Sequence, residues 1–372
     1  MNILQVIPEL DAGGAERTTI EIAQAVAEAG GTCLVASCGG RLEAELEAAG
    51  GELVRLDMKT KNPLAVWRNA ARLADLIEAR GVDLVHARSR APAWSAYWAA
   101  KRTGRPFVTT YHGIYRARSG LKRWVNSVMA RGDRVIANSE FTAAHVRDEH
   151  GVGEDRLRVI PRGVDLQRFD PERVPAETVA AMRARWGVAD GELAVLLPGR
   201  LTEIKGQAFL IDALADFDRR DAVRLVCAGD AQGRESYRTE LAETAERSGV
   251  KLALPGHETD MPTAYKAADL VVCPSVKPET FGRTVAEAQA MGAPVIAADH
   301  GGMREVVEDG VTGWRAAPSD AQAWRAAIAA ALDAGPAARE EMSKAARARV
   351  VTLFSDRALK QATLQVYREL IE

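Results

Sequence analysis

Short apolar runs alternate with longer stretches of helical periodicity along the whole chain. The runs are rich in Val and Ile and contain no regular polar alternation, which is typical of parallel strands buried on both faces. In the first half, strands are predicted at Ile3–Ile7, Cys33–Ser37, Leu84–His86, Phe107–Thr110 and Arg134–Ala137, and helices near 15–29, 64–80, 91–103, 118–131 and 139–149. This order predicts a doubly wound α/β sheet.

The same order of elements recurs after Pro161. Strands are predicted at Ala194–Leu197, Val223–Ala228, Lys251–Leu254, Leu270–Cys273 and Val295–Ala297, and helices near 206–215, 235–248, 282–291 and 319–332. We therefore expect two Rossmann-like domains, with Pro161–Pro175 as the linker. Ligands of open α/β sheets bind beyond the carboxyl ends of the strands, so the cleft between the two sheets is the expected site.

Composition is consistent with two soluble domains. The chain has 372 residues, of which 47% are hydrophobic and 27% charged, enough for two cores. No apolar run reaches the roughly 18 residues that a membrane span needs, and the first ten residues do not have the features of a secretory signal. We expect a cytoplasmic protein. The cysteines Cys33, Cys38, Cys227 and Cys273 have no zinc-site spacing and are predicted to be buried thiols.

Charge is unevenly distributed although the net charge is only -2. Between Arg55 and Arg134 there are seventeen Lys or Arg residues against five Asp or Glu. Such an excess attracts nucleic acid, anionic lipid headgroups or phosphorylated acceptors. No recognised nucleic-acid module accompanies it, so we expect no nucleic-acid partner. A well-solvated, Arg-rich surface is the alternative explanation.

Two strand-to-helix turns in the first half carry candidate chemistry. Gly13 and Gly14 lie between the first strand and the first helix, where paired glycines let backbone amides approach an anion closely. The turn does not have the GxGxxG pattern of dinucleotide-binding proteins, which argues against a dehydrogenase. His112 follows the strand that ends near Thr110, so it is expected at the mouth of the cleft.

The turns of the second half are more informative. Arg200 follows a strand and a glycine, and Lys205 precedes the next helix, so the two cations are suited to a diphosphate. Glu279 precedes a helix and Glu287 lies about two turns into it, where each carboxylate can accept hydrogen bonds from sugar hydroxyls. A glutamate buried without a partner is costly, which argues for a ligand at Glu287. The amides from Phe281 to Thr284 are expected to form an anion site at the helix N-terminus.

In their order and spacing these turns resemble the family 4 retaining glycosyltransferases, which have the GT-B fold of two Rossmann-like domains facing across a cleft. The resemblance covers nearly the whole chain. It depends on Gly13–Arg17, Tyr111–Gly113, Pro161–Asp165, Gly199–Arg200 with Lys205–Gly206, Glu279-x7-Glu287, Phe281–Gly292, Pro294–Ile296 and Gly301–Gly302. Arg162 is a departure, because the family often has Asn there; it adds a cation near the donor or the acceptor entrance.

The resemblance implies a role for each matching position. The catalytic residues would be Arg200, Lys205, His112 and Glu279, and the donor-binding residues Gly13, Gly14, Phe281, Gly282, Arg283, Thr284 and Glu287. The two cations would neutralise the donor diphosphate, His112 would contact the donor sugar near the reacting carbon, and Glu279 would hold its hydroxyls. Glu287 would hold the ribose. The glycines and the helix-end amides would close over the phosphates.

The resemblance further implies the domains and their tasks. Residues 1–165 would bind the acceptor, residues 166–355 the nucleotide-sugar donor, and a last helix near 356–372 would cross back to the first domain. Retention of configuration without a metal ion is implied, because the two cations take the place of the metal. No resident cofactor is expected, since the UDP- or GDP-linked sugar is a substrate. Asp216–Asp218 matches a metal-binding Asp-x-Asp pattern but is predicted to end a surface helix.

The acceptor is predicted from the segment Tyr115–Arg134. It mixes Arg116, Arg118, Lys122 and Arg123 with Leu121, Trp124, Val125, Val128 and Met129. This pattern is typical of an interfacial helix at an anionic membrane, or of a helix packed on the sheet. A glycan or lipid-linked acceptor in lipopolysaccharide or other cell-envelope polysaccharide biosynthesis is hypothesised. A GT-B-type nucleotide-sugar epimerase and a non-catalytic two-lobed sugar-binding protein remain alternatives.

Overall fold

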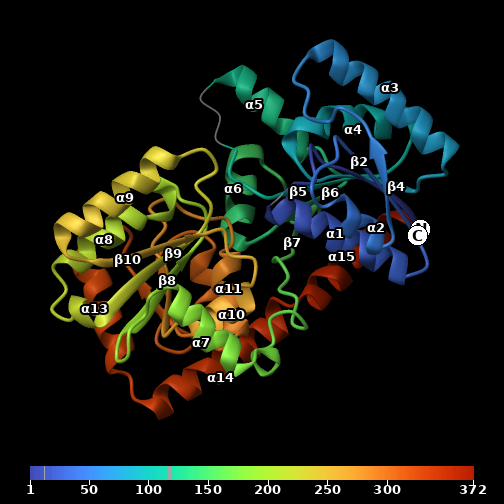
Figure 1. The fold of residues 1–372 in the computed structure, drawn as a ribbon. Coiled ribbons are helices and arrows are strands. Elements are labelled where there is room, and N and C mark those ends of the chain that lie inside the picture. Colours follow the sequence, from blue (N-terminus) through green and yellow to red (C-terminus); the bar gives the residue numbers. More distant parts are fainter. Residues whose placement is uncertain (12, 116–118) are drawn as a thin grey trace. The chain divides into compact units, whose positions relative to one another are not determined.

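The chain divides into two α/β units, each built around one parallel sheet (Figure 1). The first unit comprises Met1–Gly163 and Asp356–Glu372, and the second comprises Val164–Ser355. The computed structural model describes residues 1–11, 13–115 and 119–372. The prediction of two Rossmann-like sheets in succession is confirmed.

Seven parallel strands form the first sheet, in the order β3-β2-β1-β4-β5-β6-β7. They are β1 (Asn2–Val6), β2 (Thr32–Ser37), β3 (Gly51–Arg55), β4 (Leu84–Ala87), β5 (Phe107–Tyr111), β6 (Arg134–Ala137) and β7 (Leu157–Val159). Leu4 and Val6 belong to one core cluster, and Ile3 belongs to another. Since successive side chains of a strand point to opposite faces, the sheet is buried on both sides.

Helices cover both faces of the first sheet (Figure 1). They are α1 (Gly14–Glu28), α2 (Glu43–Ala48), α3 (Pro63–Ala79), α4 (Arg90–Thr103), α5 (Gly120–Asn126), the 3₁₀ turn η1 (Ser127–Ala130), α6 (Glu140–His150) and α15 (Asp356–Ile371). Helices α3 and α4 bury the face that holds Leu4, whereas α1 and α15 bury the face that holds Ile3. The last helix of the chain thus completes the core of the first unit.

Six parallel strands form the second sheet, in the order β10-β9-β8-β11-β12-β13. They are β8 (Leu193–Pro198), β9 (Val223–Ala228), β10 (Lys251–Gly256), β11 (Leu270–Cys273), β12 (Val295–Ala298) and β13 (Trp314–Ala316). The helices are α7 (Ala176–Arg185), α8 (Gln207–Ala215), α9 (Glu235–Ser248), α10 (Met261–Ala267), α11 (Arg283–Ala290), α12 (Met303–Val306), α13 (Ala321–Asp333) and α14 (Pro336–Leu353), with 3₁₀ turns η2 (Pro171–Arg173), η3 (Glu203–Lys205) and η4 (Arg220–Ala222).

Both sheets have a topological switch point. In the first sheet the chain order reverses between β1 and β4, and in the second between β8 and β11. Connections leave such a pair of strands in opposite directions, which opens a crevice at their carboxyl ends. The turns after these four strands are therefore the places to look for a ligand site.

Local signals set the helix that follows β3. The Asn62 side chain accepts hydrogen bonds from the amides of Leu64 and Ala65 at 2.9 and 3.3 Å. Pro63 takes the first helical position, where no amide hydrogen is needed. Together they start α3 immediately after the Lys59–Lys61 segment.

Three of the four cysteines are buried as predicted. Burial raises the pKa of Cys227 to about 12 and the pKa values of Cys33 and Cys273 to about 11, so these thiols stay protonated and unreactive. The prediction is wrong for Cys38, which is only half-buried at the end of β2, with its Sγ atom 3.6 Å from Asp57 Oδ1.

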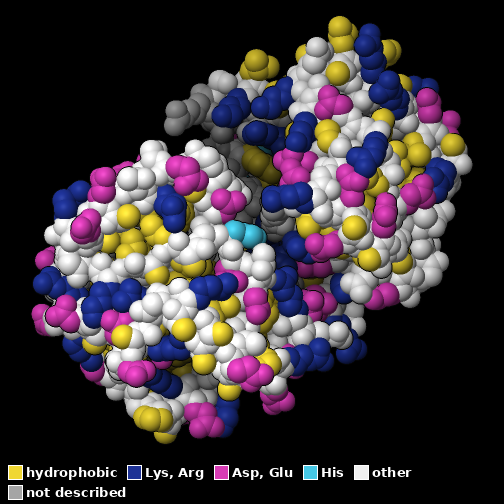
Figure 2. All heavy atoms as spheres, in the orientation of Figure 1, with side chains coloured by type: hydrophobic (Ala, Val, Ile, Leu, Met, Phe, Trp, Pro, Cys, Tyr) yellow, Lys and Arg dark blue, Asp and Glu magenta, His cyan; other side chains and the backbone are white. Residues whose placement is uncertain are grey.

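The basic excess of residues 55–134 is partly neutralised in the fold. Five of its cations form ion pairs with acids from outside the segment: Arg55–Glu43, Lys59–Glu9, Arg80–Glu52, Arg123–Glu149 and Arg134–Glu369. Figure 2 shows Lys and Arg side chains interspersed with Asp and Glu over the visible face. On this face, the positively charged side chains therefore do not form one continuous patch. Across the described ranges, no helix has both the length and the apolar character to cross a membrane.

We expect Tyr367→Phe to destabilise the first unit. His86 on β4 lies 2.6 Å from the Tyr367 hydroxyl of α15 and 2.7 Å from Thr110 Oγ1, and all three groups are buried. Removing the hydroxyl leaves the buried imidazole without one partner, which costs about 1–3 kcal/mol. Urea unfolding followed by circular dichroism measures the loss. Tyr97→Phe is the control, and an equal effect of both variants would contradict the prediction.

Candidate active site

An ion pair spans the switch point of the second sheet. Lys205, in η3 after β8, places its Nζ atom 2.7 Å from Oε1 of Glu279, in the loop after β11. The Ser275 hydroxyl donates to the same carboxylate oxygen, and His300 Nε2 lies 2.7 Å from the Ser275 carbonyl oxygen. Two of the predicted catalytic residues are therefore in contact.

Close backbone contacts hold the two sides of this pair. A Cβ atom on Gly206, whose φ is +78°, would lie 2.2 Å from the Pro274 carbonyl oxygen, so only glycine fits between η3 and the end of β11. On the other side, the Gly302 amide donates to the Glu279 carbonyl at 2.8 Å. The glutamate is thus fixed by the loop after β12 as well as by its own.

Electrostatics keep the Glu279 carboxylate charged. Burial raises its pKa, but the Lys205 charge and hydrogen bond and the Ser275 hydrogen bond lower it by more. The net pKa lies below the ordinary value of a glutamate. The site thus presents a charged carboxylate beside a cation, both only partly shielded from solvent.

Arg200 lies on the same turn but has a different partner. Its side chain is exposed, and Nη1 lies 3.4 Å from Gln232 Oε1 in the loop after β9. The backbone around it is fixed, since Gln207 Nε2 donates to the Arg200 carbonyl at 3.0 Å. The Arg200 backbone is therefore fixed, while its guanidinium is accessible to an anion.

The N-terminus of α11 follows Glu279 directly. Gly282 is the residue before the helix, with φ +105°, and no side chain caps its amides. Phe281 is buried against Phe354, with the ring centroids 5.4 Å apart, so only its backbone is available to a ligand. Thr284 Oγ1 lies 3.6 Å from Cys273 Sγ at the end of β11. These positions agree with amide recognition of an anion rather than with side-chain recognition.

Glu287 has protein partners, and this corrects one argument from sequence. Arg283 Nε lies 3.0 Å from Glu287 Oε1, and the Tyr265 hydroxyl donates to Oε2 at 3.2 Å. The carboxylate is thus not buried alone, and its burial does not require a ligand. The sequence argument overlooked Arg283, which lies four positions earlier on the same helix, and it had no local signal for Tyr265, which lies 22 positions away on α10.

In the first unit, Gly14, His112 and Arg162 come together. Arg162, beyond β7, has its Nη2 atom 3.5 Å from His112 Nδ1. A Cβ atom on Gly14 would lie 1.5 Å from Arg162 Nη1, so the guanidinium lies directly on the start of α1. A Cβ on Gly13 would instead lie 2.5 Å from Glu16 Oε2. The arginine that departs from the family pattern is thus in contact with two predicted site residues.

His112 is held as a neutral imidazole. Burial lowers its pKa well below the usual value of a histidine, and the nearby charges of Arg162 and Arg88 lower it further. Since a neutral imidazole both donates and accepts hydrogen bonds, His112 is suited to contact a sugar hydroxyl.

Sequence reasoning missed Arg88, which follows β4 at the first switch point. Its side chain is only 2% exposed, and its one hydrogen bond among the described residues joins Nη1 to Thr110 Oγ1 at 3.5 Å. Its Nε and Nη2 atoms are buried without a hydrogen-bond partner among the described residues, although the Glu21 carboxylate attracts the guanidinium electrostatically. Buried donors left without an acceptor are rare, so this arginine calls for a function. A charge directly after a buried strand, at the strand end where ligands bind, is the signal that could have identified it.

Asp216 lies at the C-terminal end of α8, as expected for the Asp-x-Asp pattern. Its carboxylate is 3.7 Å from Arg325 Nη1 and largely exposed. Within residues 1–11, 13–115 and 119–372, no group of three or more His, Cys, Asp or Glu side chains is arranged to hold a metal ion.

Comparison with known proteins identifies the family. Residues 12–168 match Glycosyltransferase Family 4, and residues 179–349 match Glycosyl transferases group 1. A D-inositol 3-phosphate glycosyltransferase of Xylanimonas cellulosilytica is 34% identical over 312 residues, which cover 77% of this chain and 72% of the relative. The chain therefore belongs to glycosyltransferase family 4, as its motifs predicted.

Solved structures agree with this assignment. A glycosyltransferase from Rickettsia africae has a TM-score of 0.93 at 33% identity, covering 100% of this chain and 98% of the other. Anabaena HepE, in complex with UDP and glucose, has a TM-score of 0.85 at 28% identity, with 100% of both chains covered. The chain is a glycosyltransferase with the GT-B fold.

We expect Arg162→Ala to raise the pKa of His112. Removing the guanidinium removes one of the charges that oppose protonation, while burial still holds the pKa below its usual value. The native state of the variant then takes up its proton at a higher pH. Less of its stability is therefore lost as the pH falls through about 6.5, the histidine pKa of the unfolded chain.

An NMR titration of the imidazole signals measures this shift. Arg162→Lys is the matched control, because it keeps a positive charge beside His112 and should change the pKa less. An unchanged His112 titration in Arg162→Ala would show that the arginine does not act on the histidine.

Proposed function

We propose that the protein transfers a sugar from a UDP-sugar to a glycan or lipid-linked acceptor with retention of configuration. The observation that carries the proposal is the Lys205–Glu279 pair at the second switch point, beside the uncapped start of α11. A cation and free helix-end amides suit a diphosphate, and a charged carboxylate next to them suits sugar hydroxyls. One turn region thus offers groups suited to the diphosphate and a group suited to the sugar of a nucleotide sugar.

The chemistry follows from where charge develops. The bond between the anomeric carbon and the β-phosphate oxygen breaks, and its electron pair stays on the diphosphate. The acceptor hydroxyl oxygen then bonds to the anomeric carbon on the same face, and its proton passes to the departing phosphate. Lys205, Arg200 and the α11 amides stabilise the growing negative charge, which is where an enzyme gains most rate. No metal ion is needed for this role, so we propose a metal-independent reaction.

The remaining residues are proposed to bind the donor. Glu279 holds the sugar hydroxyls while Lys205 keeps it ionised. Glu287, fixed by Arg283 and Tyr265, is oriented for the ribose hydroxyls. His112, kept neutral, contacts the sugar near the reacting carbon.

UDP is proposed as the nucleotide because HepE, which is 28% identical over the whole chain, binds UDP and glucose. The acceptor is less constrained. The name of the Xylanimonas relative suggests a small inositol phosphate. The mixed basic and apolar surface of the first unit instead supports a lipid-linked acceptor, and lipopolysaccharide or other envelope polysaccharide synthesis stays a prediction.

A thermal-shift panel of UDP, GDP, ADP and their glucose or mannose derivatives tests the nucleotide. We expect UDP compounds alone to stabilise the protein, by about 2.7 kcal/mol at one hundred times the dissociation constant. Turnover should be unchanged by EDTA. Stabilisation by GDP compounds alone would overturn the choice of base. Release of free UDP as the main reaction without acceptor would favour the epimerase alternative.

Activity is expected to fall at least about 100-fold in Lys205→Ala and in Glu287→Ala, because each removes a group that holds the donor or its leaving group. UDP release with the donor found in the panel measures this loss, and circular dichroism confirms folding. Lys344→Ala and Glu340→Ala are matched controls, since these residues form an exposed pair on α14. Near-normal turnover in folded Lys205→Ala would contradict the role of the lysine.

A further inference from the structure

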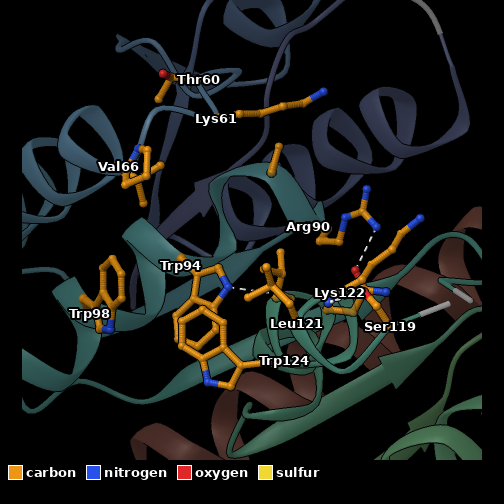
Figure 3. Close-up of a pocket in the computed structure, with 14 residues that line it drawn as sticks. Thr60, Lys61, Val66, Arg90, Trp94, Trp98, Ser119, Leu121, Lys122 and Trp124 are labelled. Carbon is orange, nitrogen blue, oxygen red and sulfur yellow. Dashed lines mark hydrogen bonds between the residues drawn. The ribbon is translucent and has the colours of Figure 1, made fainter. Parts of the chain in front are cut away.

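The first unit contains a cavity of about 540 Å³ that the donor chemistry does not use. It lies among the Thr60–Val66 segment, the start of α4 and helix α5 (Figure 3). Its apolar wall is formed by Val66, Trp94, Trp98, Leu121, Trp124 and Val125. The volume falls in the range of small-molecule sites, and the lining is mostly apolar, as such sites usually are.

The aromatic wall is preformed. Trp94 Nε1 donates to the Val125 carbonyl at 3.0 Å, which fixes the indole, and the Trp124 ring stacks on it with centroids 4.6 Å apart. The Trp98 and Trp94 ring centroids lie 5.3 Å apart, and the Arg131 guanidinium lies 5.4 Å from the Trp94 ring centroid. These contacts hold the wall in shape before any ligand arrives, so little ordering entropy is lost on binding.

The same wall is exposed to water. Leu121 is 74% exposed and Trp124 is 52% exposed, whereas Val128 and Met129 just beyond them are fully buried. The segment predicted as an interfacial or a sheet-packed helix therefore divides: its second half packs in the core, and its first half faces the cavity. A cluster of exposed large apolar side chains usually marks a binding site. Arg116 and Arg118 lie outside the described residues.

Positive charge adjoins the apolar wall. Lys61, Arg90 and Lys122 line the cavity, and no acidic residue is among its described lining residues. Arg90 is fixed by a 2.8 Å hydrogen bond from Nη1 to Asn126 Oδ1. In Figure 3, Arg90 and Lys122 lie at one end of the cavity and Trp98 at the other. The cavity is thus apolar at one end and cationic at the other.

The cavity lies at the same edge of the sheet as His112. Its walls come from the segments that follow the carboxyl ends of β3, β4 and β5, and His112 directly follows β5. Tyr115, which follows His112 closely in sequence, contacts the cationic end of the cavity: its ring centroid lies 5.1 Å from the Arg90 guanidinium, and its carbonyl accepts from Asn126 Nδ2 at 3.1 Å. The polar end of an amphiphile held in the cavity would therefore lie at the end near Tyr115, on the His112 side of the cavity.

We infer that this cavity binds the hydrocarbon chain of an anionic amphiphile, the lipid portion of the acceptor, with the anionic group on Arg90, Lys122 and Lys61. The inference rests on the proposed function and specifies its acceptor. A bilayer surface is a poorer match, because it is engaged by a convex apolar helix face and not by a concavity. A second copy of the chain would need an interface of roughly 1,600 Å², which is larger than one such cavity supplies.

Dodecyl phosphate, kept below its micelle concentration, is the probe, and isothermal titration calorimetry on the full chain measures its affinity. We expect Trp124→Ala to weaken binding about tenfold or more, because the variant removes much of one apolar wall. Lys122→Gln should weaken it about threefold, and added salt should weaken wild-type binding. Dodecyl maltoside and inorganic phosphate, which each lack one half of the probe, should bind at least about tenfold more weakly.

Matched controls are Leu353→Ser and Arg247→Gln, which change exposed side chains of the second unit. Equal affinity of Trp124→Ala and wild type would overturn the inference. So would tight binding to neutral vesicles without dodecyl phosphate binding, or a dimer that is lost in Trp124→Ala. UDP binding, measured in parallel by thermal shift, separates the two proposals. If UDP binds and the amphiphile does not, only the cavity assignment fails; if the amphiphile binds and UDP does not, only the donor assignment fails.

Discussion

The ion pair between Lys205 and Glu279 is the interaction on which the proposed donor site depends. It joins turns that lie 74 positions apart in sequence, at the place where the order of the strands reverses. Taking two charges partly out of water is costly, so such a pair adds little stability by itself. Its effect is to hold a cation and a charged carboxylate at fixed positions before the substrate arrives. Preorganised charge of this kind is the main source of catalysis where a leaving group becomes an anion.

In the first unit, too, the candidate residues lie at the carboxyl ends of parallel strands, but their chemistry differs. Arg88 follows β4, His112 follows β5 and Arg162 lies beyond β7, so positive charge surrounds an imidazole that burial keeps neutral. The guanidinium of Arg162 also lies directly on the backbone of Gly14, where any side chain would displace it. Replacement of the usual Asn by Arg thus links the first turn of the chain to the histidine, through a contact that exists only because residue 14 is glycine.

Features of the fold that leave a local pattern in the sequence could be predicted, whereas features that depend on tertiary contacts could not. Central strands are buried on both faces and leave an uninterrupted apolar run, so their positions are readable from sequence. The strands that sequence reasoning missed, β3, β7 and β13, all lie at sheet edges. Each has three to five residues, of which only one is buried, so none leaves such a run. The order of strands and helices along the chain predicted which turns carry the candidate residues. The contacts that each of these side chains makes depend on tertiary structure and could not be predicted in this way. Glu287 with Tyr265 is the clearest case, because no local pattern connects α11 to α10.

The proposed acceptor cavity shows why a relative's substrate does not transfer automatically. A small polyol phosphate is solvated on every side and offers nothing that could cover Trp124 and Leu121. A hydrocarbon chain gains roughly 0.8 kcal/mol for each methylene that it buries, so only an amphiphile draws binding energy from that wall. The cations at the other end of the cavity are equally suited to either phosphate. The apolar wall, and not the charge, is therefore the feature that discriminates between a lipid-linked acceptor and a soluble one.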